Sequence, residues 1–551
     1  MVLLAMNWKQ AKPPDDFVGF AIEYREPKTE VFWPLRNRLT FPGLDAATDP
    51  NLRSTLRSPI QKFRWVHFPL NADLEGVFTY RVTPVFMNAQ DVLTLGAPQQ
   101  LDIELRRETY PDRLNVAFTR GFVSSQAFVD RYGGNEAIPQ LIPANADAGL
   151  TFKPTHPKAD DAYAWMGFEA RREILTRLDE ALADGQAQVR VVAYELNLPE
   201  LVDRLKRLGP RLRIIVDNSA KHGAATSAES QAATILAGSA GAANVRRQHV
   251  GNLQHNKTIV VDGPRVKAAV CGSTNMSWRG FYVQSNNAVV VRGAHAIRPF
   301  AAAFDDYWEH GSGKTEFGAT RSAEWTPLGL RGIDAKVAFS PHSATNALLA
   351  SIADDMRSHT TSSLLYSLAF LYQTPGVIQD AIKSVMEDDK LFVYGISDRK
   401  VGGLDVLLPD GNVAPVYPSQ LAGKGVPEPF KSEPSGGSGI RMHHKFVVVD
   451  FDRPTARVYL GSYNFSTAAD ASNGENLVLI RNRRIAVSYM VQALTLFDHY
   501  QFRVLQLDAK KRKKEPRAQA AAAEGWRGGL VGRGLHGSPQ DPRPRAVLVE
   551  R

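Results

Sequence analysis

The sequence has little of what would mark a secreted or membrane-spanning protein. Its 551 residues include one cysteine, Cys271, which excludes an intrachain disulfide and favours a reducing compartment. No stretch approaches the roughly 18 consecutive apolar residues that a membrane-spanning helix needs. The apolar run VLLAM after Met1 is too short for the core of a signal peptide, and no basic region precedes it. We therefore expect a cytoplasmic protein.

The charge and the length restrict the partners and the architecture without deciding either. The chain has a net charge of +9 and a pI near 9.4. That balance favours anionic partners such as nucleic acid or acidic lipid headgroups. A chain of this length is expected to form roughly two to four domains.

Residues 1–130 are expected to form a small β-sandwich that acts as an accessory domain. Short segments rich in aromatic and β-branched residues, such as DFVGFAIEYRE and GVFTYRVTPVFMN, are separated by breaks that contain proline, glycine or asparagine. This pattern is typical of sandwiches of the fibronectin or immunoglobulin type. The segment offers no nucleophile constellation and no metal-ligand cluster.

From about residue 145 strands alternate with helices, and the same order occurs twice. In the first unit, 145–310, an amphipathic helix over 169–184 precedes the strand VRVVAY, the helix LPELVDRLKRLG and the strand LRIIVD. In the second unit, 335–507, a helical apolar spacing precedes SLLYSLAF, TPGVIQDAIKSV and KLFVYGISD. The repeat predicts an α/β protein of two lobes, each with helices packed on a mixed sheet.

Two further segments have the composition of loops. Residues 401–438 are rich in glycine, proline and serine, and we expect them to gate access to a site. Residues 508–551 contain the basic run KKRKKEPR and then mainly alanine, glycine and proline. We expect this part to be a disordered tail, in which the basic run is more typical of a solvated segment than of a specific binding site.

A motif of the form H-x-K-x4-D, followed by G-S-x-N, occurs once in each lobe. The first copy is HNKTIVVDGPRVKAAVCGSTNMS and the second is HHKFVVVDFDRPTARVYLGSYNFS. The matching members of the two copies are His255 and His443, Lys257 and Lys445, Asp262 and Asp450, Ser273 and Ser462, and Asn275 and Asn464. Two complete copies at equivalent places in a repeat are not expected by chance.

The arrangement within each copy predicts a phosphate site. Alternate side chains of a strand share a face, so His443 and Lys445 point the same way while His444 points away. An imidazole, an ammonium group and the uncharged donors of serine and asparagine then surround one point, as an oxyanion requires. Two copies face to face would let one histidine attack phosphorus while the other protonates the leaving oxygen. A metal site is not predicted, because the lysine beside each histidine repels a cation.

The duplicated motif resembles that of the phospholipase D superfamily, and the resemblance covers about residues 145–507. It implies a covalent phosphohistidine intermediate, no metal or other cofactor, and attack by water or an alcohol in the second step. It also implies that the lysines and asparagines bind phosphate. In the family the motif aspartates, here Asp262 and Asp450, more often support the site than touch the substrate. The N-terminal histidine, here His255, is the usual nucleophile.

One acidic position makes the two lobes different. NGENLVLI places Glu475 after the second G-S-x-N, where a glutamate often accompanies the motif in the family, whereas the first lobe has Asn286 there. If Glu475 lies near His443, its carboxylate raises the pKa of that ring. His443 would then be the better general acid, and a neutral His255 the better nucleophile. If Glu475 instead reached His255, this argument would be reversed.

Other side chains near the motif have both a functional and a structural interpretation. For His444, His222 and His249 we favour a packing role over a place in the site. The aromatic residues after the first G-S-x-N are equally compatible with a substrate groove and with the core; they are Trp278, Phe281 and Tyr282.

The sequence therefore predicts a monomeric, metal-independent phosphodiester hydrolase with one active site shared by the two lobes. The leading substrate is a glycerophospholipid, cleaved to phosphatidate and an alcohol, and the alternative is a nuclease acting on DNA or RNA. Both substrates are anionic, so the positive charge suits contact with an anionic membrane or with nucleic acid. A binding protein without activity is the least favoured interpretation, because both copies of the motif are complete.

Overall fold

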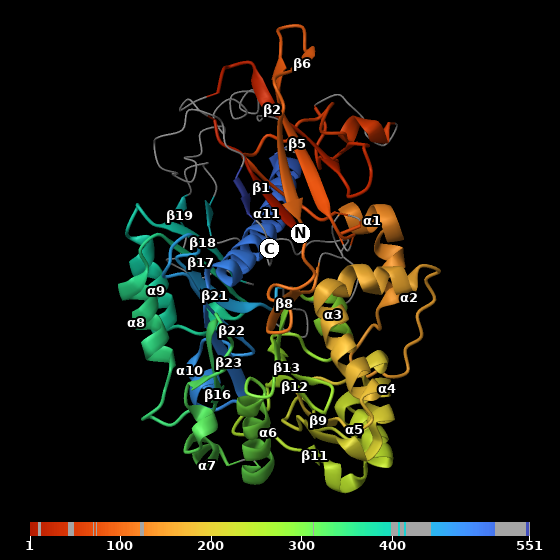
Figure 1. Ribbon diagram of the computed structural model, residues 1–551, viewed down its shortest axis with the longest axis vertical. Coiled ribbons are helices and arrows are strands. Elements are labelled where there is room, and N and C mark those ends of the chain that lie inside the picture. Colours follow the sequence, from red (N-terminus) through yellow and green to blue (C-terminus); the bar gives the residue numbers. More distant parts are fainter. Residues whose placement is uncertain are drawn as a thin grey trace. The chain divides into compact units, whose positions relative to one another are not determined.

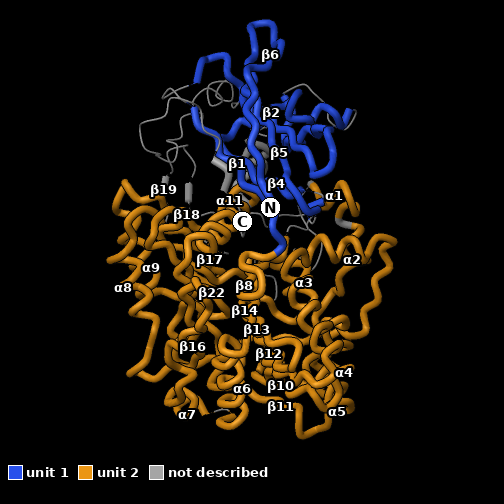
Figure 2. Tube along the Cα trace, in the orientation of Figure 1, with its two compact units in different colours: residues 1–107, 407–413, 506–551 blue, residues 108–406, 414–505 orange. Residues whose placement is uncertain are grey.

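The structure of the protein, a computed structural model, describes residues 1–8, 13–41, 49–69, 71–72, 74–121, 126–311, 313–397, 406–407, 413–414, 442–512 and 547–549. The chain divides into two compact units (Figure 2), one of residues 1–107, 407–413 and 506–551 and the other of residues 108–406 and 414–505. Most of the expected gate, 401–438, and most of the expected tail, 508–551, lie outside the described residues, so both remain predictions.

The first unit is built from antiparallel strands (Figure 1). One sheet has the order β3-β2-β5-β6, with β7 also paired to β5, and the other has the order β24-β1-β4. The strands are β1 Val2–Ala5, β2 Phe17–Arg25, β3 Trp33–Pro34, β4 Arg64–His67, β5 Val77–Met87, β6 Leu93–Leu95, β7 Gln99–Glu104 and β24 Val547–Val549. Apolar side chains of both sheets, among them Leu4, Ile22 and Phe78, share one core. The predicted all-β character of this region is confirmed.

The second unit contains two mixed sheets. The first has the order β11-β10-β9-β12-β13-β14-β8, and the second has the order β15-β16-β23-β22-β21-β17-β18. The strands of the first sheet are β8 Leu114–Phe118, β9 Gln188–Ala193, β10 Leu212–Val216, β11 Val245–Arg247, β12 Lys257–Asp262, β13 Lys267–Gly272 and β14 Asn287–Arg292. Those of the second are β15 Thr326–Pro327, β16 Asp334–Ser340, β17 Ser363–Leu368, β18 Phe392–Ile396, β21 Lys445–Val449, β22 Arg457–Gly461 and β23 Glu475–Arg481. A short pair, β19 Val406–Leu407 and β20 Val413–Ala414, lies outside both sheets.

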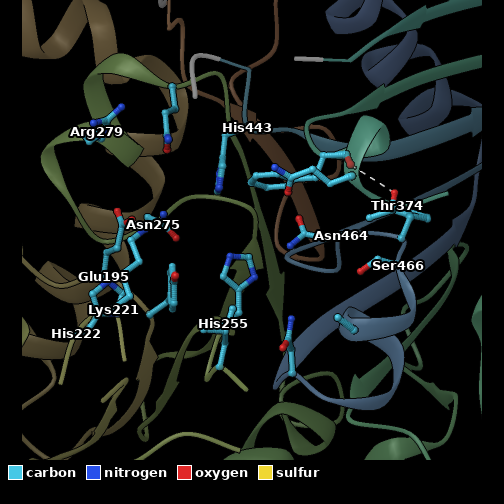
Figure 3. Close-up of a pocket in the computed structure, with 18 of the residues that line it drawn as sticks. Glu195, Lys221, His222, His255, Asn275, Arg279, Thr374, His443, Asn464 and Ser466 are labelled. Atoms are coloured by element: carbon cyan, nitrogen blue, oxygen red, sulfur yellow. Dashed lines mark hydrogen bonds and ion pairs between the residues drawn. The ribbon is translucent and has the colours of Figure 1, made fainter. Parts of the chain in front are cut away.

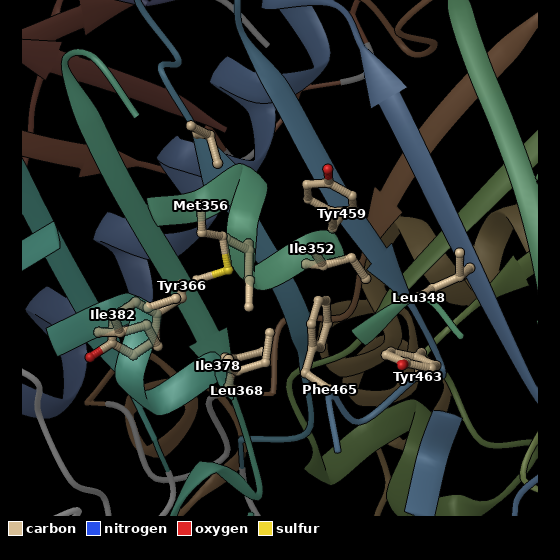
Figure 4. Close-up of a cluster of buried hydrophobic side chains, with 14 of the residues drawn as sticks. Leu348, Ile352, Met356, Tyr366, Leu368, Ile378, Ile382, Tyr459, Tyr463 and Phe465 are labelled. Atoms are coloured by element: carbon tan, nitrogen blue, oxygen red, sulfur yellow. The ribbon is translucent and has the colours of Figure 1, made fainter. Parts of the chain in front are cut away.

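Helices pack on these sheets, which confirms the predicted α/β class with two repeated lobes. They are α1 Gln126–Tyr132, α2 Ile138–Leu141, α3 Ala159–Ala183, α4 Pro199–Leu208, α5 Ala228–Ala240, α6 Arg298–His310, α7 Lys314–Gly318, α8 Leu349–His359, α9 Val377–Met386, α10 Thr467–Ala471 and α11 Arg483–Arg512. In the second lobe Ile352 and Met356 of α8 and Ile382 of α9 pack against Tyr366 of β17 and Tyr459 of β22 (Figure 4). This core fixes the strands that lead to the motif.

The first lobe begins earlier in the chain than expected. β8 pairs with β14 at the edge of the first sheet, so residues 114–118 belong to this lobe and not to the β domain that we expected to extend to residue 130. β8 is the counterpart of β16, which pairs with β23 in the second lobe. Its sequence LNVAF does not alternate, because all of its residues are buried.

Candidate active site

The two H-x-K segments meet at one cavity. His255 lies just before β12 and His443 just before β21, so each histidine stands at the entrance to an inner strand of its sheet. The ring centroids of the two histidines are 6.4 Å apart. Both rings line a cavity of about 1230 Å³ (Figure 3). The fold thus brings together two motifs that are far apart in the sequence.

Each of these histidines is held by a side chain from the other lobe. Nδ1 of His255 lies 2.6 Å from Oε2 of Glu475, and Nδ1 of His443 lies 2.9 Å from Oδ1 of Asn286. All four residues are buried. Of the two positions that the sequence left open for Glu475, the structure therefore has the one beside His255. The repeat explains why each lobe supplies the partner of the other lobe's histidine. Glu475 begins β23, and Asn286 directly precedes β14, the equivalent strand of the first lobe.

The motif serines support these two acceptors. Oγ of Ser273 donates to Oδ1 of Asn286 at 2.9 Å, and the hydroxyl of Ser462 hydrogen-bonds to Glu475. Each serine oxygen also accepts a backbone N–H from the neighbouring strand. Both serines are buried and neither lines the cavity. They orient the groups that hold the histidines, whereas the sequence had suggested direct phosphate binding.

Both motif lysines are buried beside the histidines. Nζ of Lys445 lies 3.1 Å from Nε2 of His443 and 2.9 Å from the carbonyl oxygen of the same residue, while Lys257 donates to the carbonyl oxygen of His255. Burial lowers the pKa of Lys257 to about 7, and it lowers the pKa of Lys445 well below its usual value. A buried ammonium group is costly unless it is paired, so an anion bound beside the lysines would favour their charged form.

Protonation separates the two halves of the site. Burial lowers the pKa of both His255 and His443 well below the ordinary value, and the nearby lysines lower it further. Burial raises the pKa of Glu475 to about 7, although the ammonium group of Lys257 opposes the rise. Glu475 can therefore gain or lose a proton near neutral pH, whereas the amide of Asn286 cannot.

The motif asparagines face each other across the cavity (Figure 3). Asn275 lies on the side of the first lobe and Asn464 on the side of the second. In both, the amide oxygen is buried without a hydrogen-bond partner among the described residues. Buried polar atoms are normally satisfied, so these amides are available to a polar ligand.

The motif aspartates lie away from the cavity, at the far ends of their strands. The strand length, about 17 Å, separates each aspartate from the lysine of its motif. Asp450 is buried and accepts backbone N–H groups of Thr361 at 2.9 Å and Ser362 at 2.8 Å. Burial alone would raise its pKa, but these bonds hold the pKa below its usual value. Asp262 is partly exposed and pairs with Lys267. These contacts favour structural support over a direct role, because Asp450 binds residues 361–362 and Asp262 binds a lysine at the start of β13.

The three additional histidines differ in position. His444 points away from the cavity, as strand alternation predicts, and its Nε2 lies 3.1 Å from Nε2 of Gln492. His249 does not line the cavity. His222 does line it, with Nδ1 2.8 Å from Oδ2 of Asp217, contrary to the packing role that we favoured.

The residues after the first G-S-x-N divide between the cavity and the core. Trp278 and Arg279 line the cavity. Phe281 and Tyr282 are buried in the π-helical turn Arg279–Val283 and do not reach it.

Two cavity-lining residues that lie outside the duplicated motif make the cavity asymmetric. Glu195 and Phe370 hold equivalent positions in the repeat. Each comes two residues after the strand residue that pairs with the motif lysine, Ala193 in β9 and Leu368 in β17. The sequence alone does not reveal this equivalence, because it depends on the register between strands.

The two walls of the cavity differ in the same sense. Charged lining residues on the first-lobe side are Asp147, Glu195, Lys221, Glu229 and Arg279. The second-lobe side combines uncharged polar residues, such as Gln373 and Thr374, with large apolar residues, which are Leu349, Phe370, Pro375, Val377, Ile378 and Phe465. Asp470 is charged but lies within the second wall bonded to His342 and Tyr463. A ligand that fills the cavity would meet more charged groups on the first-lobe side and more large apolar groups on the second-lobe side.

Within the described ranges, no group of three or more His, Cys, Asp or Glu side chains is placed to hold a metal ion. No helix in that part of the chain combines the length and the apolar character needed to cross a membrane.

A family described as "Cardiolipin synthase, PLD-like domain" matches residues 178–308 and 411–495, one segment in each lobe. The two lobes are PLD-like domains of the phospholipase D superfamily. Curated relatives include the enzymes named phospholipase D of Rickettsia prowazekii and Rickettsia felis. Each is 40% identical over 48 residues, which is 9% of this chain and 22% of the relative. The chain thus matches about a fifth of the length of these relatives.

Two solved structures are also similar. Phosphatidylserine synthase of Haemophilus influenzae is 15% identical, with a TM-score of 0.41 over 64% of this chain and 93% of that one. The phospholipase D family member Nuc of Salmonella typhimurium is 25% identical, with a TM-score of 0.22 over 26% of this chain and 88% of that one.

Proposed function

We propose that the protein cleaves a phosphodiester through a phosphohistidine on His255, and that its substrate is a glycerophospholipid. The observation that carries this proposal is the pair of buried imidazoles 6.4 Å apart in one cavity, each with Nδ1 hydrogen-bonded to the other lobe. Those bonds leave Nε2 of His255 to attack phosphorus. Nε2 of His443 lies 3.1 Å from Nζ of Lys445, and a bound phosphate would accept the hydrogen bond of that ammonium group in its place. A lysine beside each ring supplies the charge that a phosphate needs.

In the first step Nε2 of His255 attacks phosphorus, and the P–O bond to the leaving alcohol breaks. Nε2 of His443 gives its proton to the leaving oxygen. A bound phosphodiester anion offsets the repulsion from the lysines, so it raises the depressed pKa of His443 and favours the protonated form. Positive charge develops on His255 as the N–P bond forms, and the carboxylate of Glu475 at Nδ1 stabilises that charge.

In the second step water attacks phosphorus and His443 takes its proton. The P–N bond breaks, which releases phosphatidate and restores His255. A second alcohol in place of water would give a new phosphodiester by the same route. The motif lysines and asparagines would hold the non-bridging oxygens in both steps.

The division of the cavity supports a phospholipid over a nucleic acid. The charged first-lobe wall suits a headgroup, and the apolar second-lobe wall suits the glycerol and acyl region. Single-stranded nucleic acid is bound in basic grooves that track the backbone. Among the described lining residues the lysine and arginine side chains are those of Lys221 and Arg279. The names of the Rickettsia relatives point the same way. We further propose action as a monomer at an anionic membrane surface.

The test is to incubate the protein with glycerophospholipid vesicles and, separately, with single- and double-stranded DNA, all in EDTA. We expect phosphatidate from the vesicles, intact DNA and no effect of EDTA, and no product from the His255→Ala control. Added ethanol distinguishes hydrolysis from transfer, because transfer yields phosphatidylethanol. DNA cleavage without a lipid product would contradict the proposed substrate, and activity restored by a divalent ion after EDTA would contradict metal independence.

A further inference from the structure

We infer that Glu195 forms a headgroup subsite in the first-lobe half of the cavity, selective for an alcohol that donates hydrogen bonds through a hydroxyl or a primary ammonium group. This inference rests on the proposed phospholipid reaction. It assigns the choice of headgroup to the first-lobe wall of the cavity, which lies outside the duplicated motif.

Glu195 directly follows a residue that packs against the reacting histidine. Tyr194 precedes it, and the Tyr194 ring lies 4.6 Å from the ring of His255 and 4.8 Å from Nζ of Lys257. At the equivalent position of the second lobe Phe370 lies 6.2 Å from the ring of His443. A carboxylate and an aromatic ring therefore occupy equivalent places on opposite walls. The two substituents of a phospholipid phosphate differ in the same way, one being polar and the other apolar.

The carboxylate of Glu195 is prepared to accept a further hydrogen bond. Its Oε2 accepts from the hydroxyl of Ser277 at 2.7 Å, while Oε1 is 3.8 Å from Nζ of Lys221, beyond hydrogen-bond distance. Burial opposes ionisation, but Lys221 and Ser277 outweigh it and lower the pKa of Glu195. The side chain is only 16% exposed, and it lines the cavity. An ionised oxygen in this position favours an N–H or O–H of a ligand.

The neighbours of Glu195 narrow the class of headgroup. The wall carries charges of both signs, Lys221 and Arg279 beside Asp147, Glu195 and Glu229, so the net charge of a headgroup does not decide its binding. The ability to donate a hydrogen bond does, because a quaternary ammonium group has no proton to donate to Oε1. Hydroxyl and primary ammonium groups can donate, so glycerol and ethanolamine headgroups are expected to bind better than choline.

The experiment compares initial rates on vesicles of phosphatidylcholine, phosphatidylethanolamine and phosphatidylglycerol with identical acyl chains. We expect the wild-type protein to prefer the two donating headgroups over choline by about tenfold, as one charge-assisted hydrogen bond implies. Glu195→Gln keeps the shape but removes the charge. It should lower the ethanolamine-to-choline rate ratio about tenfold and the glycerol-to-choline ratio less.

Two further variants make the result decisive. Ser277→Ala removes the hydrogen bond that holds Glu195 in place and helps to keep it ionised. It should therefore lower the same headgroup rate ratios as Glu195→Gln, by a smaller factor. Glu180→Gln is the matched control, because Glu180 pairs with Arg177 and does not line the cavity. Ratios in both Glu195→Gln and Ser277→Ala equal to those of the control, or a wild-type preference for choline, would overturn the subsite but not the lipid reaction. Inactivity on all three lipids would overturn both.

Discussion

The two lobes share a scaffold but differ in the groups attached to their histidines. In both, a histidine and a lysine lead into a buried inner strand, and a residue from the other lobe accepts a hydrogen bond from Nδ1. That residue is Glu475 for His255 and Asn286 for His443. The walls differ in the same way, with Glu195 in the first lobe where the second has Phe370. Substitutions at equivalent positions thus give two copies of one scaffold different chemistry.

The difference matters because phosphoryl transfer through a histidine asks opposite things of the two rings. The nucleophile carries positive charge for as long as the N–P bond exists, and a carboxylate stabilises that charge. The acid has to release its proton, and a neutral amide does not hinder the release. The position of Glu475 therefore supports His255 as the nucleophile, by an argument opposite to the one the sequence suggested.

The largest expected effect comes from removing either member of the histidine pair. His255→Ala and His443→Ala should each reduce kcat by at least about 10³-fold, as losses of a nucleophile or its acid do. His444→Ala is the matched control and should stay within about tenfold, because His444 faces away from the cavity. Steady-state kinetics on vesicles checks this, with each variant shown to be folded by thermal melting. Near-normal turnover in either of the first two would exclude a shared site.

A smaller but more specific effect is expected from Glu475→Gln, which makes the first histidine's partner an amide like that of the second. We expect kcat to fall about 100-fold, because charge on His255 is no longer compensated. Burial raises the pKa of Glu475 to about 7, so its carboxylate is mostly ionised above pH 7 and protonated below. Wild-type kcat/KM should therefore fall as pH decreases through about 7, and the variant should lose this dependence. A variant with the wild-type profile would show that another group titrates.

The reciprocal change sharpens the comparison. In the substrate complex the bound phosphodiester already favours protonated His443, so the carboxylate that Asn286→Asp places at Nδ1 should raise the pKa of that ring further and make it a weaker acid. We expect about a tenfold loss of kcat, least for substrates with good leaving groups. The comparison of a lipid ester with a nitrophenyl phosphodiester measures this. An equal loss on both would indicate that the introduced carboxylate acts on something other than proton transfer to the leaving oxygen.

The smallest catalytic effect is expected at the motif aspartates, which differ from each other in stability. Asp450→Ala leaves the backbone N–H groups of Thr361 and Ser362 without their acceptor, and should lower the free energy of unfolding by about 2–4 kcal/mol. Asp262→Ala should cost less than about 0.5 kcal/mol, because its ion pair is partly exposed. Both should keep kcat within a few-fold of the wild type. Denaturant unfolding and kinetics together check this, and a stable but inactive Asp450→Ala would contradict it.

The sequence predicts most of the fold but only part of the site. Helical spacing, strand alternation and the repeat are local properties, so the lobes and the orientation of His443 and His444 could be inferred. The contact of Glu475 with His255 could not be inferred, because it depends on which strand end of one lobe faces which histidine of the other. Glu195 belongs to no motif, and only the register of β9 against β12 places it opposite Phe370. For Asp450, the length of the strand between it and Lys445 already favoured structural support over contact with the substrate.

The most direct test of the account is to identify the histidine that carries the covalent intermediate. Turnover of a phospholipid is stopped under alkaline denaturing conditions, the protein is digested, and the phosphatidyl adduct is located by mass spectrometry. The account predicts an adduct on the peptide that contains His255 and none on the peptide that contains His443. An adduct on the His443 peptide alone would contradict it, because Glu475 would then support the general acid and Asn286 the nucleophile.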